Sequence, residues 1–325
     1  MDTSVNYLGQ QLRTPIIIGS CGLSTDLDTM QRLEDLGAGA IILKTKFEEE
    51  FAYDIKHGAN ILMRTDAYGE SYNYVSKQMT KSSIDEYFDY VSKLTSVLTI
   101  PVIGSISCVS FESWVNYVKR YEASGVKAME FNMSLHPYNP SLTTADVDRI
   151  YNQILMTLRR ICNVPVALKL PPYFTDMAHS VQRFSWSGVK AISFFGMEAP
   201  MDIDIEQQEI INGGRDIVTS NFHTMLRWIA ALSPRINCDL SAATGIEGWV
   251  EVVKALLAGA ATVQLNTTLY RNGIERLRET HDGLVDWMQR HGHESIDQFR
   301  GSLAIDRHKD LTAFMRIMSM QSVNL

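Results

Sequence analysis

The stretch Gly188-Val-Lys-Ala-Ile-Ser193 belongs to a recurring pattern with four related copies along the chain. The copies begin at Gly37, Gly125, Gly188 and Gly259, and each follows an amphipathic segment and opens an apolar run. Glycine in this setting is typical of a helix C-cap, and the apolar run that follows is typical of a buried strand. One helix-to-strand unit that is used repeatedly indicates alternating helices and parallel strands.

Eight apolar runs bounded by turn residues qualify as strands of this unit. They are Ile16–Ser20, Ala40–Thr45, Val102–Ile106, Ala128–Asn132, Val166–Leu170, Ala191–Phe195, Asn237–Ser241 and Thr262–Asn266. Apolar residues at helical steps separate them, as in Leu27, Met30, Leu33 and Leu36. Eight strands alternating with helices favour an α/β fold of the closed (β/α)8 TIM barrel type over an open doubly wound sheet.

Two segments exceed what a minimal barrel needs. The connection between the second and third strands, residues 46–100, is far longer than a loop and one helix require. It contains a tyrosine-rich run at Tyr68–Tyr74 and a helical pattern at Ile84–Leu98, and we expect it to form a lid or rim over the barrel mouth. Residues 285–325 predict a C-terminal helical tail. Since no internal linker is visible, we expect residues 1–325 to form a single domain.

Composition and charge argue against several classes of protein. Hydrophobic residues make up 45% of the 325 residues and charged residues 21%, which is ordinary for a globular protein. The formal net charge of −7, without a block of basic residues, argues against nucleic acid as a partner. The four scattered cysteines fit free thiols in a reducing cytoplasm. No signal peptide and no membrane-spanning run are visible, so we expect a cytoplasmic protein without a membrane partner.

Polar and small residues gather at the predicted carboxyl ends of the strands, where barrel enzymes carry their chemistry. They are Gly19–Gly22, Lys44, Thr45, Asn132–Ser134, Lys169, Ser241–Ile246 and Asn266–Thr268. Two lysines, an asparagine and several small hydroxyl residues are therefore expected to face one mouth of the barrel.

Lys169 lies in the stretch Val164-Pro-Val-Ala-Leu-Lys-Leu-Pro-Pro-Tyr-Phe174. It follows an apolar strand pattern, and the Pro171-Pro172 pair prevents the strand from continuing. A lysine at this place is costly to bury unless an anion or an electron-rich cofactor meets it. The alternative is an ammonium group that extends past the strand end into solvent.

The last two loops of the barrel predict a phosphate site. Small residues at Ala242–Gly245 expose backbone N–H groups, and Thr267 or Thr268 can add a hydroxyl donor near a helix start. Phosphate sites after the seventh and eighth strands recur in this fold. The alternative is that these small residues only close the barrel.

At these residues the sequence resembles the dihydroorotate dehydrogenase family of FMN-dependent barrels, and within it a branch described as dihydroorotate dehydrogenase-like. The resemblance runs from Asn6 to about Leu303. It is most specific at Val166–Phe174, in the phosphate loops and at Glu294–Gly301. The resemblance implies a flavoprotein oxidoreductase with FMN as its cofactor.

The resemblance also implies a role for each matching residue. Lys169 corresponds to the lysine beside the flavin ring, Lys44 to one that contacts flavin and substrate, and Asn132 to the substrate-binding asparagine. The set implied to bind FMN is Ser20, Cys21, Gly22, Lys44, Thr45, Asn132, Lys169, Thr244, Gly245, Asn266 and Thr267. No metal ligand is implied.

The loop after the fourth strand departs from the family pattern. The family has Asn-x-Ser-Cys-Pro-Asn, or Ser in place of Cys, and that Cys or Ser is the general base. Here the loop reads Asn132-Met-Ser-Leu-His-Pro137, which places Leu135 at the base position. Leucine accepts no proton, so we assign Ser134 as a catalytic residue together with Lys44 and Lys169.

Other side chains compete for the role of base. His136 flanks the vacant position, and Cys108 and Cys21 lie near strand ends. Each has a structural alternative, because His136 can be an ordinary loop histidine and a cysteine near a strand end is often a small buried apolar residue. Phe195 takes the place of the asparagine with which the family clamps its substrate.

The sequence therefore predicts an FMN-dependent dehydrogenase acting on a CH–CH bond. By resemblance, the reaction is dihydroorotate to orotate in pyrimidine biosynthesis. The alternatives are an FMN-dependent reductase of a different small anionic alkene, a barrel aldolase with Lys169 as Schiff base, and a binding protein that has lost catalysis. As partners we expect a small anionic substrate, a separate electron acceptor such as fumarate, and a second copy of the chain in a homodimer.

Overall fold

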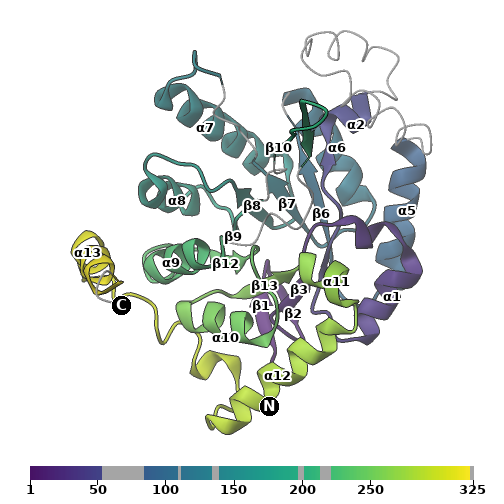
Figure 1. The fold of residues 1–325 in the computed structure, drawn as a ribbon. Coiled ribbons are helices and arrows are strands. Elements are labelled where there is room, and N and C mark those ends of the chain that lie inside the picture. Colours follow the sequence, from purple (N-terminus) through teal and green to yellow (C-terminus); the bar gives the residue numbers. More distant parts are fainter. Residues whose placement is uncertain (53–83, 109–110, 134–138, 197–200, 213–220, 323–325) are drawn as a thin grey trace.

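Eight parallel strands close into a barrel in the computed structural model, which describes residues 1–52, 84–108, 111–133, 139–196, 201–212 and 221–322 (Figure 1). The strands are β3 (Ile16–Ile18), β4 (Ile41–Ile42), β6 (Val102–Ser107), β7 (Ala128–Asn132), β8 (Val166–Leu170), β9 (Ala191–Phe194), β12 (Asp239–Ala242) and β13 (Thr262–Leu265). Their order is β4-β3-β13-β12-β9-β8-β7-β6, and pairing of β4 with β6 closes the ring. The predicted (β/α)8 TIM barrel is confirmed.

The second strand is shorter than the sequence predicts, with Ile41–Ile42 in place of Ala40–Thr45. Past its carboxyl end, backbone N–H groups donate hydrogen bonds to serine side chains and not to a neighbouring strand. The N–H of Lys44 donates to Ser24 Oγ at 2.6 Å, and the N–H of Thr45 donates to Ser20 Oγ at 2.7 Å. These bonds interrupt the strand pairing with β6, between β4 and β5 (Lys46–Phe47), at the mouth of the barrel.

Helices surround the barrel, as Figure 1 shows. They are α1 (Leu27–Asp35), α5 (Ile84–Val97), α6 (Phe111–Ala123), α7 (Thr144–Ile161), α8 (Met177–Ser185), α9 (Phe222–Leu232), α10 (Trp249–Ala258) and α12 (Arg276–Arg290). Each buries an apolar stripe, such as Met30 and Leu33 on α1. At the start of α7, Thr143 and Asp146 form a reciprocal capping box.

The four recurring glycines end helices as predicted. Gly37, Gly125, Gly188 and Gly259 have φ values of +107°, +82°, +98° and +109°. Glycine adopts this left-handed conformation at little cost, whereas other residues pay about 1–2 kcal/mol. At Gly259 a side chain is also excluded by contact, because a Cβ would lie 2.3 Å from Ser233 Oγ.

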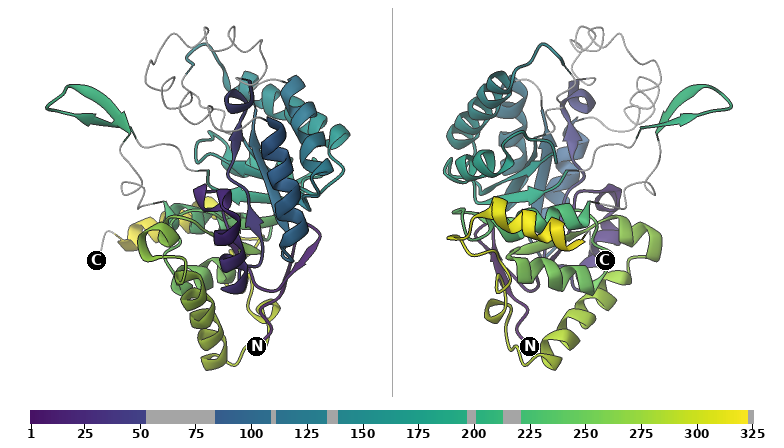
Figure 2. Two further views of the ribbon diagram at one scale, coloured as in Figure 1. Left: turned by 90° about the vertical axis from the view of Figure 1, so that its right-hand side faces the viewer. Right: turned by 60° about the vertical axis from the view of Figure 1, so that its left-hand side comes forward.

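Two antiparallel hairpins were not predicted from the sequence. β1 (Val5–Tyr7) and β2 (Gln10–Leu12) are joined by Leu8 and Gly9, both with positive φ, as in the tight turns that suit hairpins. β10 (Met201–Asp204) and β11 (Glu209–Asn212) follow β9 and extend away from the barrel (Figure 2). The second hairpin exposes apolar side chains: Met201, Ile203, Ile205, Ile210 and Ile211.

The insertion after β4 is described at its two ends. It begins with β5 (Lys46–Phe47), which pairs with β6, and α2 (Glu48–Ala52). It ends with α5, which confirms the predicted helix to within one residue and buries Phe88, Val91 and Leu94. The tyrosine-rich run at 68–74 lies outside the described residues.

The remaining short elements lie at the barrel mouth and in the C-terminal tail. They are η1 (Gly22–Thr25), α11 (Thr267–Asn272), η3 (Ile296–Gln298) and α13 (Leu311–Ser322). α13 lies beside α9 (Figures 1 and 2). Among the residues that the structure describes, no helix has the length and apolar character needed to cross a membrane.

Candidate functional site

A cavity of about 300 Å³ opens at the carboxyl ends of the barrel strands. It brings together every residue that the sequence implied for FMN binding: Ser20, Cys21, Gly22, Lys44, Thr45, Asn132, Lys169, Thr244, Gly245, Asn266 and Thr267. Phe47, Phe195, Gly196, Gln264 and Tyr270 complete much of the wall. Ser134 lies outside the described residues, so the structure does not test its assignment as a catalytic residue.

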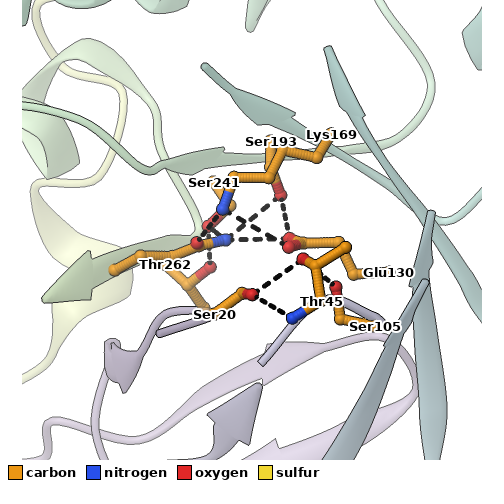
Figure 3. Close-up of polar contacts among 9 residues, drawn as sticks. Ser20, Thr45, Ser105, Glu130, Lys169, Ser193, Ser241 and Thr262 are labelled. Atoms are coloured by element: carbon orange, nitrogen blue, oxygen red, sulfur yellow. Dashed lines mark hydrogen bonds and ion pairs between the residues drawn. The ribbon is translucent and has the colours of Figure 1, made fainter. Parts of the chain in front are cut away.

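Lys169 points into the barrel and not out to solvent. The residue is only 5% exposed, although it lines the cavity. Its Nζ donates to Gln264 Oε1 at 3.0 Å and lies 3.4 Å from Glu130 Oε1. Figure 3 shows Lys169 and Glu130 on different strands with their side chains directed into the barrel. The ammonium is therefore held by a buried amide and a buried carboxylate at the floor of the cavity.

A separate hydrogen-bonded network of hydroxyl groups lies near the carboxyl ends of the first two barrel strands. Ser20 Oγ lies 2.8 Å from Thr45 Oγ1, which lies 2.8 Å from Ser105 Oγ (Figure 3). Ser20 Oγ also accepts the N–H of Thr45 at 2.7 Å. Because each hydroxyl is fixed by a neighbour, Ser20 and Thr45 present ordered polar groups to the cavity.

The wall beside Gly19 fits a flat polar ligand such as the flavin of FMN. A Cβ at Gly19 would lie 2.5 Å from Asn266 Oδ1, so only glycine lets the backbone and the amide lie this close. Asn266 Oδ1 is buried and has no hydrogen-bond partner among the described residues. A buried amide oxygen without a donor is costly, and a ligand N–H would satisfy it. Gly22 is similarly close to Tyr270, with 2.9 Å from a Cβ to the hydroxyl oxygen.

The loops after β12 and β13 fit the phosphate of the same cofactor. Gly245 has φ +71°, and a Cβ there would lie 2.6 Å from Cβ of Phe222. Thr268 Oγ1 donates to Glu247 O at 3.0 Å, and Thr268 is fully buried. Its hydroxyl is therefore committed to the protein, and Thr267, which lines the cavity, is the threonine left to meet a phosphate.

Another part of the cavity wall is lined by Lys44, Phe47, Asn132 and Phe195, and by resemblance it is the part expected to face the substrate. Phe195 is 2% exposed and packs on Phe194, with ring centroids 4.9 Å apart. The chemistry of this wall is therefore mixed, with one cation, one amide and two aromatic rings. Leu135 and His136 lie outside the described residues.

Cys108, one of the candidate bases, does not line the cavity. Burial raises the pKa of its thiol well above the ordinary range, and the charges of Glu48 and Glu49 add to this shift. A thiol in this environment keeps its proton at neutral pH and accepts none. Cys21 does line the cavity and keeps its place among the candidates.

The sequence did not identify four polar residues at and beneath the cavity floor. Glu130, Ser193, Thr262 and Gln264 are all buried inside the barrel, and Gln264 also lines the cavity. The available signal was a charged or amide side chain at alternate positions of otherwise apolar strands, such as Glu130 two residues before Asn132. The sequence alone did not indicate that these buried polar residues would meet, because they meet only when the barrel closes.

The fold and the site define a flavin-binding barrel dehydrogenase. Residues 3–288 match the family model described as dihydroorotate dehydrogenase, and the chain belongs to this family. Enzymes of the family bind FMN and act on CH–CH donors, so FMN is the cofactor of this chain.

Curated relatives are distant in sequence but match most of the chain. Dihydroorotate dehydrogenase (fumarate) of Saccharomyces mikatae is 26% identical over 92% of this chain and 98% of its own. Dihydroorotate dehydrogenase B (NAD(+)), catalytic subunit, of Thermoplasma acidophilum is 23% identical over 92% and 98%. The chloroplastic dihydropyrimidine dehydrogenase (NADP(+)) of Arabidopsis thaliana is 23% identical over 92% of this chain and 76% of its own.

Proposed function

We propose that this chain catalyses hydride exchange between FMN and the CH–CH or C=C unit of a small anionic molecule, with dihydroorotate as the first substrate to test. The observation that carries the proposal is the single cavity that joins Lys44, Asn132 and Lys169 to the two phosphate loops. Family membership supports the reaction class, and the cavity walls support the substrate class.

Three residues of the cavity have a task in this reaction. Lys44 binds the acidic group of the substrate, and Asn132 orients it by hydrogen bonding. Lys169 faces the flavin and favours its electron-rich state by charge. When bound, FMN supplies the hydride-accepting centre. A base of the protein must take the second hydrogen of the CH–CH unit as a proton.

A second candidate is a reductase of a different activated alkene. Two observations favour it: Leu135 replaces the family's base, and Phe195 in the cavity wall replaces its substrate-clamping asparagine. Phe195 adds a ring where the family offers an amide, which suits a substrate with an apolar edge. The aldolase alternative is less well supported, because Lys169 is ion-paired with Glu130 and a Schiff-base lysine must lose its proton.

The test is a visible absorption spectrum of the protein loaded with FMN, repeated without oxygen after dihydroorotate is added. Bleaching of the flavin bands would support dihydroorotate, and reoxidation by fumarate or by NAD(+) would identify the acceptor. Unchanged bands would exclude dihydroorotate, and a panel of anionic alkenes given to the chemically reduced protein would then test the second candidate. A protein that takes up no FMN would contradict the whole proposal.

The electron acceptor and the homodimer belong to the same proposal. The relatives' names refer to fumarate and NAD(+) as acceptors, and one type is named a catalytic subunit, which supports a separate acceptor or partner for this chain. Exposed apolar residues support a dimer: Ile203 is 56% and Ile205 78% exposed on the β10–β11 hairpin, and Met320 is 69% exposed on α13. Light scattering of the eluting protein would measure the mass, and a monomer would contradict the dimer. Activity in a cytoplasmic fraction would test the predicted location.

A further inference from the structure

A buried carboxylate, Glu130, lies behind the ammonium group of Lys169 in the barrel interior. Glu130 is the third residue of β7, two positions before Asn132, so both side chains point to the same face of the strand. Glu130 has no exposed surface and does not line the cavity, whereas Lys169 does. Glu130 can therefore affect a molecule in the cavity only through the residues between them.

The two oxygens of the Glu130 carboxylate have different surroundings. Oε2 accepts Ser193 Oγ at 2.8 Å and Gln264 Nε2 at 3.0 Å. Oε1 has no hydrogen-bond partner among the described residues and lies 3.4 Å from Lys169 Nζ. Two bonds to one oxygen fix the plane of the carboxylate and direct the other oxygen at the ammonium (Figure 3).

The amide of Gln264 links the members of this ion pair. Its Oε1 accepts from Lys169 Nζ at 3.0 Å, and its Nε2 donates to Glu130 Oε2 at 3.0 Å. β13, which carries Gln264, is separated from β8 by β12 and β9, so the amide reaches across the barrel interior. A reversed amide would place N–H groups against the ammonium and a carbonyl against the carboxylate. The charges on both sides therefore select one orientation.

We propose that Glu130, held by Gln264 and Ser193, is a positioning residue that fixes the ammonium of Lys169 at the cavity floor and offsets part of its charge toward the flavin. The proposal rests on the proposed function, because it takes FMN to bind against Lys169. Stability alone does not account for the pair, since packed apolar residues of similar volume stabilise an interior as well or better. Because Glu130 Oε1 faces the ammonium of Lys169, the carboxylate holds that group in one position and sets the charge around it.

This arrangement has a measurable consequence for the bound cofactor. A positive charge beside the flavin favours the reduced form, and a carboxylate 3.4 Å behind that charge opposes the effect. Glu130→Gln keeps the size of the side chain and removes the negative charge. We expect the midpoint potential of bound FMN to move to a more positive value, because the ammonium is no longer offset.

The experiment measures the midpoint potential of bound FMN by dye-coupled reductive titration of the wild type, Glu130→Gln and a control. Thr157→Val is the matched control, because Thr157 is a buried polar residue of α7 whose hydroxyl bonds to Gln153 O, away from the cavity. The control should keep the wild-type potential. An unchanged or lowered potential in Glu130→Gln would overturn the inference. A wild type that binds no FMN would instead overturn the proposed function, so the two failures are distinguishable.

Two further variants separate positioning from other effects. With Lys169→Met as the background, Glu130→Gln should shift the potential by less than in the wild type, because the carboxylate there acts on the flavin only by its own charge and no ammonium remains to be held in place. An equal shift in both backgrounds would overturn the positioning role. If Glu130→Gln does not fold, Glu130→Asp replaces it, since the charge is kept but withdrawn by one methylene. A smaller shift in the same direction is then expected, and a wild-type potential would overturn the inference.

Discussion

The proposed flavin side and the proposed substrate side of the cavity differ in their side chains. On the flavin side, Ser20, Thr45 and Lys169 lie at strand ends and are tied to one another or to buried residues by side-chain hydrogen bonds. On the proposed substrate side, Phe195 stands where the family pattern has an amide, and in the sequence Leu135, which lies outside the described residues, stands where the pattern has a base. Lys169 lies within β8 and Phe195 directly follows β9, so both are positioned by the barrel, whereas residues in the connection after β7, such as Leu135, can change without disturbing it. Under the proposed function, we infer that the cofactor chemistry is retained and that the substrate is the variable part.

The largest effect is expected from Lys169→Met, which removes the cation of the flavin side. The rate of FMN reduction by a competent substrate should fall about 10²–10³-fold, the usual loss when one preorganised electrostatic group is removed. Anaerobic stopped-flow absorbance measures this rate. An unaffected rate would remove Lys169 from the mechanism.

The same variant tests the ion pair in the barrel. Glu130 is left as an unpaired buried carboxylate, which costs about 3–5 kcal/mol of folding free energy. The matched variant is Lys169→Met combined with Glu130→Gln, which should recover much of the stability without recovering the rate. Urea unfolding of both variants measures the difference, and equal stability would show that the pair does not couple.

Gly19→Ala tests the contact between backbone and amide on the flavin side. The new Cβ would lie 2.5 Å from Asn266 Oδ1, so Asn266 must move and the cofactor wall changes shape. We expect the dissociation constant of FMN to rise about 10–100-fold, equivalent to about 1.4–2.8 kcal/mol. Fluorescence quenching of added FMN measures the affinity.

Gly37→Ala is the control for this substitution. The new Cβ would have no heavy atom within 4 Å. Because φ at this position is +107°, the alanine should lower the free energy of unfolding by about 1–2 kcal/mol without touching the cavity. FMN affinity should be that of the wild type. An equal loss of affinity in both variants would mean that the wall beside Gly19 has no special part in binding.

Leu135→Cys tests the substrate side by restoring the family's base. If only the base is missing, FMN reduction by dihydroorotate should increase about 10-fold or more, within the range of general base catalysis. The rate should rise with pH as the new thiol, with an ordinary pKa of about 8.5, loses its proton and becomes able to accept one. Leu135→Ala is the control without a base. No gain, even when Phe195→Asn is added, would show that the pocket itself serves another substrate.

The smallest effect is expected from Cys108→Ala. Burial keeps the pKa of this thiol above its ordinary range, so it remains protonated below that pKa and its loss removes no base. The rate of FMN reduction should stay within about twofold of the wild type, with the same pH profile. If Cys108→Ala removed the change of rate at alkaline pH that the wild type shows, Cys108 would again be a candidate for the base.

The sequence predicted the barrel, and the gathering of polar residues at one mouth of it, for a physical reason. Gly37 and Gly259 lie at the C-terminal ends of helices, and the local pattern alone predicts their positive φ values. Lys169 and Asn132 could be placed at one mouth because parallel strands in a barrel share their carboxyl end. The pattern did not reveal the β10–β11 hairpin, whose exposed apolar residues lack the buried face that usually marks a strand.

The local pattern of the chain was sufficient for the order of the strands and for the residues at their ends, because helix caps, apolar periodicity and proline stops act within a few residues. Only the tertiary structure brought Glu130 and Gln264 to Lys169, over 39 and 95 residues of chain. Such contacts depend on barrel closure and on which face each strand turns inward. A buried ammonium between an amide and a carboxylate is a property of the closed barrel, and no segment of this sequence contains it.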